Sequence, residues 1–166
     1  MIKGRKILVT GSSDGIGRSI SNFLLDYGAS VVGIARNHKK FNPESNNYHK
    51  YVVDLSEKQI LIKQFSKILN DHTDIDGLIS NAGYGDFGGL ETFSFNNIDD
   101  YIFTNLVSHI LITSMVIPLL KKLSKETSKF KKCVFITFKH ENIYNLLKIN
   151  KNTKVGLSFA PPTSIK

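Results

Sequence analysis

The sequence is poor in cysteine and has no long apolar run. Cys133 is the single cysteine among 166 residues, so no internal disulfide is expected, and a reducing intracellular setting is favoured. The sequence contains no run of eighteen or more apolar residues, so no membrane span is expected. The first residues, MIKGRKILVTG, lack the apolar stretch and cleavage site of a secretory signal. We therefore expect a cytoplasmic protein without a membrane partner.

Acidic residues are scarce at one end of the chain, and metal-ligand spacing is absent. Residues 121–166 contain 11 basic and 2 acidic residues, whereas residues 1–120 contain 11 basic and 12 acidic ones. A polyanionic partner for this basic segment is one hypothesis. Because no aromatic interleaving or nucleic-acid motif accompanies the lysines, we favour the alternative that they are solvated side chains on a helix end and loop, and nucleic acid is not expected.

The histidines, among them His109 and His140, lack the spacing of metal ligands, so no metal site is predicted.

Apolar runs alternate with helical patterns along the chain. Strands are expected at 5–10, 30–35, 48–55, 75–80, 132–138 and 154–160. Helices are expected at 16–27, 57–70, 97–123 and 141–150, with Ser56 capping the second helix and Pro118 kinking the third or marking its last turns. Strands that are apolar throughout indicate a parallel sheet covered on both faces. The pattern predicts one α/β domain over residues 1–166, a doubly wound, Rossmann-like three-layer sandwich with a mainly parallel sheet of about six strands.

Two of the helices carry apolar side chains at helical spacing. In the first they are Ile16, Ile20, Phe23, Leu24 and Tyr27, with Gly28 as the stop. In the second they are Ile60, Leu61, Phe65, Ile68 and Leu69. The second set forms the apolar side of its helix.

A glycine cluster, TGSSDGIG at 10–17, lies where the first strand meets the first helix. Gly11 permits the sharp turn, Gly15 allows a ligand to approach the backbone, and Gly17 lets the helix lie close to the sheet. The helix N-terminus offers free N–H groups and a partial positive charge, and its natural ligand is a pyrophosphate. The alternative is a glycine turn that only permits tight packing.

The spacing G-x-x-x-G-x-G resembles that of the short-chain dehydrogenase/reductase family, classical type. Four further segments extend the resemblance over about the first 138 residues: VVDLS with Asp54, SNAG with Asn81, TNLVSHILIT with Asn105, and VIPLLKK. The resemblance implies an oxidoreductase that transfers hydride between a nicotinamide cofactor and a small alcohol or carbonyl substrate. It implies cofactor contacts from Gly11, Ser12, Ser13, Gly15, Ile16, Gly17, Arg36, Asp54, Leu55, Asn81, Ala82 and Gly83.

The end of the second strand bears on the choice of cofactor. An NAD enzyme places a carboxylate there to accept from the ribose hydroxyls, but here Ala35 is followed by Arg36. A guanidinium can pair with a 2′-phosphate, so NADP(H) is favoured over NAD(H). A solvated loop arginine is the alternative. Asp14 within the turn is a departure, because related NADP enzymes often carry a basic residue near that position.

Catalytic residues are implied by the resemblance at Tyr144, Lys148 and Asn105. Tyr144 would be the acid/base, Lys148 would tune its pKa from the same helix face, and Asn105 would anchor a proton-relay water. Phe138 stands where the family has its catalytic serine, and Thr137 is a weak substitute. The sixth strand also follows Lys148 early, which a deletion between the fifth and sixth strands would explain. The alternative function is a catalytically degraded dinucleotide-binding module that acts as a sensor or partner protein.

The resemblance also bears on assembly and on the substrate. The family normally adds a substrate-binding segment and a seventh strand, and we expect neither within residues 1–166. Family members pair through the long helix predicted at 97–123, so a homo-oligomer is a hypothesis. There Ile102, Leu106, Ile110 and Ile117 fall near one stripe, which could instead face the sheet.

Overall fold

The computed structural model describes residues 2–85, 90–127, 131–136 and 153–158. Its centre is a six-stranded, wholly parallel sheet in the order β3-β2-β1-β4-β5-β6. The strands are β1 (Lys6–Thr10), β2 (Ser30–Ala35), β3 (Tyr48–Val52), β4 (Gly77–Ser80), β5 (Lys131–Ile136) and β6 (Thr153–Ser158). This order is typical of Rossmann folds, and the predicted fold class is confirmed.

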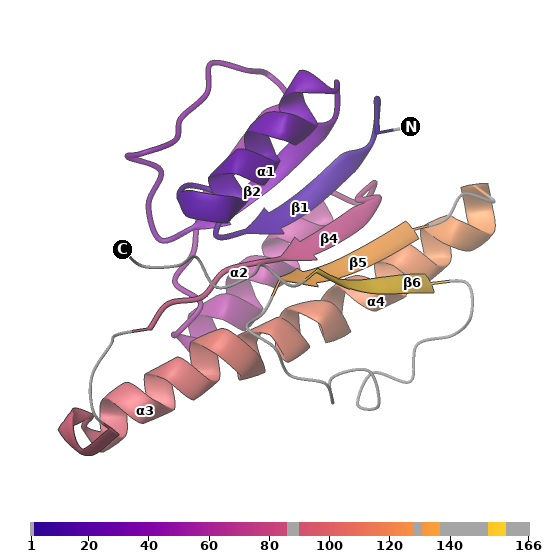
Figure 1. Ribbon diagram of the computed structural model, residues 1–166. Coiled ribbons are helices and arrows are strands. Elements are labelled where there is room, and N and C mark those ends of the chain that lie inside the picture. The colour runs from indigo at the N-terminus through magenta and orange to yellow at the C-terminus, as the bar shows by residue number, and fades with distance from the viewer. Residues whose placement is uncertain (1, 86–89, 128–130, 137–152, 159–166) are drawn as a thin grey trace.

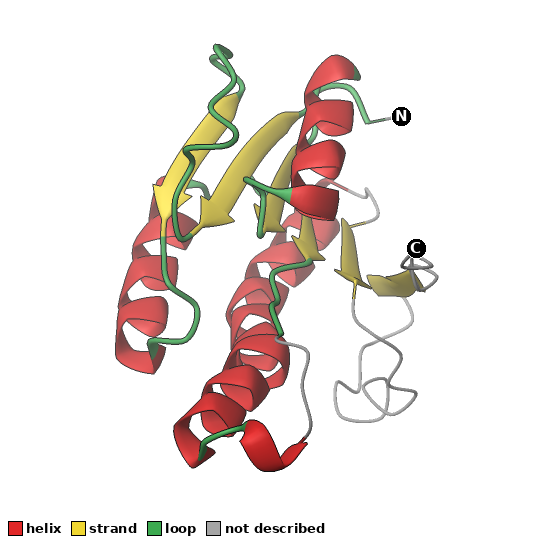
Figure 2. Cartoon of the chain, turned by 60° about the vertical axis from the view of Figure 1, so that its left-hand side comes forward, coloured by secondary structure: helices red, strands yellow, loops and turns green. Residues whose placement is uncertain are grey.

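Helices cover both faces of the sheet (Figures 1 and 2). Helix α1 (Gly15–Asp26) packs on β1 and β2 on one face, while α2 (Lys58–Asp71) and α4 (Ser108–Thr127) lie together on the other. Two apolar cores result. The larger, on the α2 and α4 side, includes Leu61, Phe65, Ile112 and Val116, all fully buried. The predicted three-layer arrangement is therefore present.

Helix α1 begins and ends where the turn residues dictate. The Asp14 carboxylate caps its N-terminus by accepting from the Gly15 N–H at 2.9 Å. Gly28 ends it with a φ of 75°, a conformation that suits glycine. Three of the apolar residues at helical spacing, Ile16, Phe23 and Tyr27, are 49 to 60% exposed. The narrow face toward the sheet holds small residues and Leu24, because Gly17 and Ser21 bring the helix axis close.

Helix α2 also corrects two expectations. Ser56 is not its cap: the N-cap is Glu57, which makes no side-chain capping bond. Ser56 instead donates its N–H and its hydroxyl to Asp54 Oδ1, at 3.0 and 2.8 Å, in a turn before the helix. Ile60 is 44% exposed, so the buried stripe is narrower than the sequence pattern predicts.

The long helix predicted at 97–123 is built from three consecutive segments. They are α3 (Phe95–Ile102), the π-helical turn η2 (Phe103–Val107) and α4; a short 3₁₀ turn, η1 (Leu90–Thr92), precedes them. Pro118 lies inside α4. By length and composition alone, Phe95–Glu126 is long and apolar enough to cross a membrane. Its buried residues Ile112, Val116 and Leu120 pack against the sheet, which accounts for the apolar composition as that of a core helix.

A histidine pair lies at the amino end of the sheet and predicts acid sensitivity. The rings of His49 on β3 and His72 after α2 are 4.9 Å apart, and Tyr51 Oη lies 3.0 Å from His72 Nε2. Burial, followed by the charge of Lys6, lowers the pKa of both imidazoles, although Asp74 acts in the opposite direction. In the unfolded chain the two histidines keep pKa values of about 6.5, so below that pH the unfolded state binds more protons than the folded state. The free energy of unfolding therefore falls as the pH decreases through that value.

We expect the urea midpoint to be lower at pH 5.5 than at pH 7.5. Replacing His49 with Gln removes one titrating group and relieves repulsion on the other, so the difference between the two midpoints should shrink. An identical pH dependence in the wild type and His49→Gln would contradict this account.

Candidate dinucleotide site

The carboxyl ends of four parallel strands bring separate sequence segments to one edge. The glycine turn follows β1, Arg36 follows β2, Asp54 follows β3 and Asn81 follows β4. The chain builds the sheet outward from β1 through β2 and β3 and then returns to place β4 on the other side of β1. This reversal is the switch point at which doubly wound sheets bind ligands. The glycine turn and the Asn81 segment flank it.

The glycine turn is closed by contacts that leave no room for side chains. Gly11 has a φ of 67°, and a Cβ there would lie 2.9 Å from Ala82 Cα and from Asn81 Nδ2. A Cβ on Gly17 would overlap the Gly11 carbonyl and lie 2.5 Å from Asn81 Nδ2. Gly15, with a φ of 49°, has nothing within 4 Å of its own Cβ position. The first and third glycines therefore pack the turn, and the middle one leaves open space at the start of α1.

Thr10, the last residue of β1, fastens the Asn81 segment to the turn. Its buried Oγ1 accepts from the backbone N–H groups of Asn81 and Ala82, at 2.9 and 3.0 Å. The Asn81 side-chain amide donates to the carbonyls of Thr10 and Gly11, at 3.1 and 3.5 Å. Sequence reasoning missed Thr10, although its place directly before the first glycine was a usable signal.

Asn105 holds the chain just beyond Gly83. It lies within the π-helical turn, a feature that often marks functional sites. Its Oδ1 accepts from the Tyr84 N–H at 3.0 Å and its Nδ2 donates to the Tyr84 carbonyl at 2.7 Å. A Cβ on Gly83 would approach Asn105 Oδ1 to 2.9 Å. The Asn105 side chain thus positions the segment after β4, a role that uses both of its polar groups.

His109, one helical turn after Asn105, contacts the end of β4 and the segment that follows it. Its Nε2 lies 2.6 Å from the Ala82 carbonyl and its Nδ1 lies 2.7 Å from Ser80 Oγ. A carbonyl only accepts, so Nε2 carries the proton, and in the neutral ring Nδ1 accepts from the Ser80 hydroxyl. Burial lowers the pKa of His109, which favours this neutral form. Sequence reasoning considered His109 only as a metal ligand and missed this contact.

The remaining predicted contact residues differ in exposure. Arg36 is exposed, with its guanidinium 5.4 Å from the centre of the Tyr84 ring. Asp54 is exposed and Leu55 is buried in the larger core. Ser12 is buried and donates its N–H to the Ile34 carbonyl at 3.1 Å, whereas Ser13 is half-buried and Ile16 is exposed. Tyr144 and Lys148, with Thr137 and Phe138, lie outside the described residues.

The residues present fit a dinucleotide. The α1 N-terminus is exposed at Asp14 and Gly15, and the open space at Gly15 is where a pyrophosphate would approach the backbone N–H groups. Within the described ranges, no group of three or more His, Cys, Asp or Glu side chains is placed to hold a metal ion. The site thus offers backbone donors and cations for a phosphate-bearing ligand.

A family model described as short chain dehydrogenase matches residues 5–129. The chain belongs to this family. The resemblance inferred from the glycine turn and from Asn81 is therefore confirmed, and the matched range contains all the predicted cofactor-contact residues.

Individual short-chain dehydrogenases are similar to part of the chain. Gluconate 5-dehydrogenase of Gluconobacter oxydans is 35% identical over 112 residues, which are 63% of this chain and 44% of that protein. The 3-oxoacyl-(acyl-carrier-protein) reductase of Haemophilus influenzae is 32% identical over 126 residues, 73% of this chain and 52% of that one. The chain thus spans about half the length of these curated relatives.

A solved structure shares the fold. The crystal structure of 3-ketoacyl-(acyl-carrier-protein) reductase from Brucella melitensis complexed with NADH superposes with a TM-score of 0.74 at 20% identity. The match covers 83% of this chain and 59% of that one.

Proposed function

We propose that this chain binds NADP(H) at the glycine turn and serves an oxidoreductase of the short-chain dehydrogenase type. The observation that carries the proposal is the exposed start of α1, bared by Gly15 at the switch point of the sheet. A helix N-terminus in that place pairs free N–H groups and a positive dipole end with a pyrophosphate. Related solved structures contain NADH or NAD, as in the Brucella melitensis reductase and an NADH-dependent reductase, A1-R′, and they support a pyridine nucleotide as the ligand class.

The preference for NADP(H) over NAD(H) rests on the residues after β2. Ala35, Arg36 and Asn37 supply no carboxylate to accept from the ribose hydroxyls, and Arg36 supplies an exposed cation. Its guanidinium lies over the Tyr84 ring, at the same edge as the glycine turn. A cation there supports a 2′-phosphate, which a carboxylate would repel.

The proposed reaction is hydride transfer between the nicotinamide and a small alcohol or carbonyl compound. The named activities of the relatives, a gluconate dehydrogenase and acyl-carrier-protein reductases, support this reaction class. Tyr144 is proposed as the acid/base, with Lys148 tuning its pKa. Asn105, whose side chain also holds Tyr84, stays the proposed anchor of the relay water. Self-association through the exposed Ile102 and Leu106, and a cytoplasmic location, stay predictions.

A non-catalytic dinucleotide-binding module is the second candidate. It is favoured by the connection between β5 and β6, which are parallel neighbours separated by the 16 residues 137–152. A crossover between parallel strands needs a dozen or more residues, so the 16 residues between these two strands exceed that requirement by only a few.

Fluorescence titration of NADPH and NADH, followed by a carbonyl-substrate screen, separates these candidates. We expect NADPH to bind more tightly than NADH by about tenfold or more, since a charge-assisted pair contributes about 1.5–3 kcal/mol. Arg36→Asp should reverse that preference, and Lys63→Asp, on the exposed side of α2, is the matched control. Turnover that Tyr144→Phe abolishes would support the oxidoreductase. Binding without turnover across the panel would support the module, and binding of neither nucleotide would contradict both.

A further inference from the structure

The loop between β2 and β3 folds back over the glycine turn and is fixed on both sides of Lys40. His38 and Phe41 are 9% and 6% exposed, and the Phe41 N–H donates to the His38 carbonyl at 3.2 Å. The Phe41 ring packs edge-on against Tyr48, with ring centres 5.2 Å apart. The Arg18 guanidinium of α1 lies over the same Phe41 ring, 5.8 Å from its centre. The backbone around Lys40 is therefore anchored by buried residues two positions before it and one position after it.

A buried chain of polar side chains ties this loop to the turn. Ser12 Oγ lies 2.9 Å from Tyr48 Oη, which lies 3.1 Å from His38 Nδ1. His38 Nε2 lies 3.1 Å from the Tyr51 carbonyl, so that nitrogen donates. Satisfied polar groups at this depth specify one arrangement, because separating them would leave buried donors and acceptors unpaired. The loop and the turn thus form one unit.

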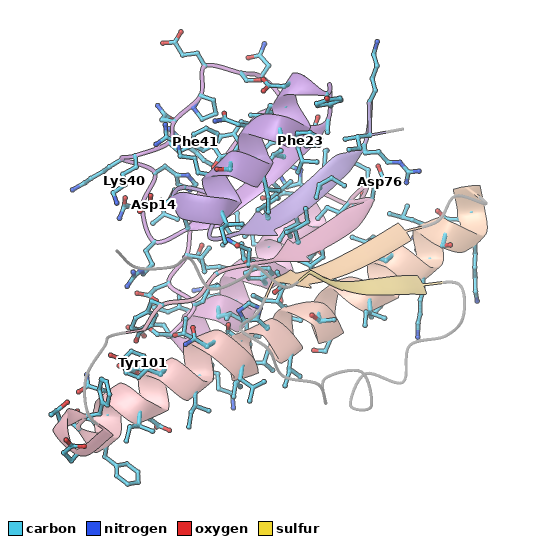
Figure 3. All side chains as sticks on the ribbon, viewed as in Figure 1. Asp14, Phe23, Lys40, Phe41, Asp76 and Tyr101 are labelled. Atoms are coloured by element: carbon cyan, nitrogen blue, oxygen red, sulfur yellow. The ribbon has the colours of Figure 1, made fainter. Side chains whose placement is uncertain are left out.

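This unit brings Lys40 against Asp14. Lys40 Nζ lies 2.5 Å from Asp14 Oδ2, while Asp14 Oδ1 caps the Gly15 N–H (Figure 3). Both side chains are exposed, at 68% and 61%. The hydrogen bond from Lys40, followed by that from Gly15, holds the pKa of Asp14 below its usual value, so the carboxylate is charged at neutral pH.

The charge of Asp14 matters for the proposed cofactor. The turn and the end of β2 are adjacent, since Ser12 donates its N–H to Ile34 near Arg36. The ribose of the adenosine half lies at this place in doubly wound folds. An isolated carboxylate here would repel a 2′-phosphate that carries nearly two negative charges, whereas a paired one presents little net charge.

We propose that Lys40 is a specificity-determining residue, which neutralises Asp14 at the rim of the glycine turn and so allows a 2′-phosphorylated adenosine to bind beside Arg36. The inference rests on the proposed NADP(H) preference and names the residue that makes it compatible with an acidic turn. Arg36 supplies the attraction, and Lys40 removes the repulsion.

The test compares adenosine 2′,5′-bisphosphate with adenosine 5′-monophosphate, which differ by the 2′-phosphate alone, in calorimetric titrations at low salt. Lys40→Met should weaken the bisphosphate about tenfold, as one uncompensated charge facing a dianion would, and leave the monophosphate within about twofold. Adding Asp14→Asn to Lys40→Met should restore wild-type affinity, because Asn keeps the helix cap without the charge.

Lys39→Met is the matched control, since Lys39 is an exposed neighbour with the same charge. Loss in Lys40→Met no larger than in Lys39→Met would overturn the inference, as would a double variant as weak as Lys40→Met alone. Wild-type protein that binds the monophosphate as tightly as the bisphosphate would overturn the NADP(H) preference itself, which is a separate outcome.

Discussion

Gly17→Ala should weaken nucleotide binding strongly, whereas a Gly→Ala change at Gly4, away from the turn, should not. The added Cβ would overlap the Gly11 carbonyl and crowd Asn81 Nδ2 at 2.5 Å, and neither the turn backbone nor the bonded amide can retreat freely. Relieving the overlap moves α1 away from the sheet and opens the turn. We expect Kd for the cofactor to rise roughly 100-fold, equivalent to about 3 kcal/mol, with a fall in the urea midpoint.

Gly4→Ala is the matched control for this prediction. Gly4 has a φ of 74°, yet nothing lies within 4 Å of its Cβ position, and it precedes β1 at the opposite end of that strand from the turn. It therefore carries the backbone strain of a left-handed alanine, about 1 kcal/mol, without the overlap. Far-UV circular dichroism confirms that each variant folds. A folded Gly17→Ala protein that binds as tightly as Gly4→Ala would contradict the proposed site.

The sequence was sufficient for the parts of the site that depend on local pattern. The glycine turn has a strand before it and a helix after it, and the apolar strands imply parallel pairing, so the meeting of Gly11, Arg36 and Asn81 at one edge was predictable. The residues that hold these segments together were not. Thr10, Tyr48 and His38 act on groups far away in sequence, and no periodicity reports such pairings.

Helical spacing predicted where the helices lie better than it predicted which of their residues are buried. Helical spacing marked Ile16, Phe23 and Tyr27 as one apolar side, but Gly17 and Ser21 bring a different strip of α1 against the sheet. The π-helical turn around Asn105 was also invisible, because no residue type in FTNLV marks the change from i→i+4 to i→i+5 hydrogen bonding. Both features depend on how the helix meets the sheet, which is a tertiary property.

His109→Leu should destabilise the fold and weaken cofactor binding together. Leucine fills the space but leaves the buried Ser80 hydroxyl and the Ala82 carbonyl without their partner. An unsatisfied buried group costs about 1–3 kcal/mol, and a domain of this size loses about 2–4 °C in Tm per kcal/mol, so we expect a fall of roughly 5–10 °C. Cofactor affinity should fall as well, because Ala82 is held between Thr10 and His109.

Ser80→Ala isolates one half of the His109 contact. It removes the donor to Nδ1 and leaves the bond to Ala82, so its effect should have the same sign and be smaller. In a His109→Leu background Ser80→Ala should restore part of the lost stability, because it deletes the orphaned hydroxyl. Differential scanning calorimetry with and without NADPH measures both effects. Additive losses in the double variant would show that the two side chains act independently and would contradict a stabilising hydrogen bond between Ser80 and His109.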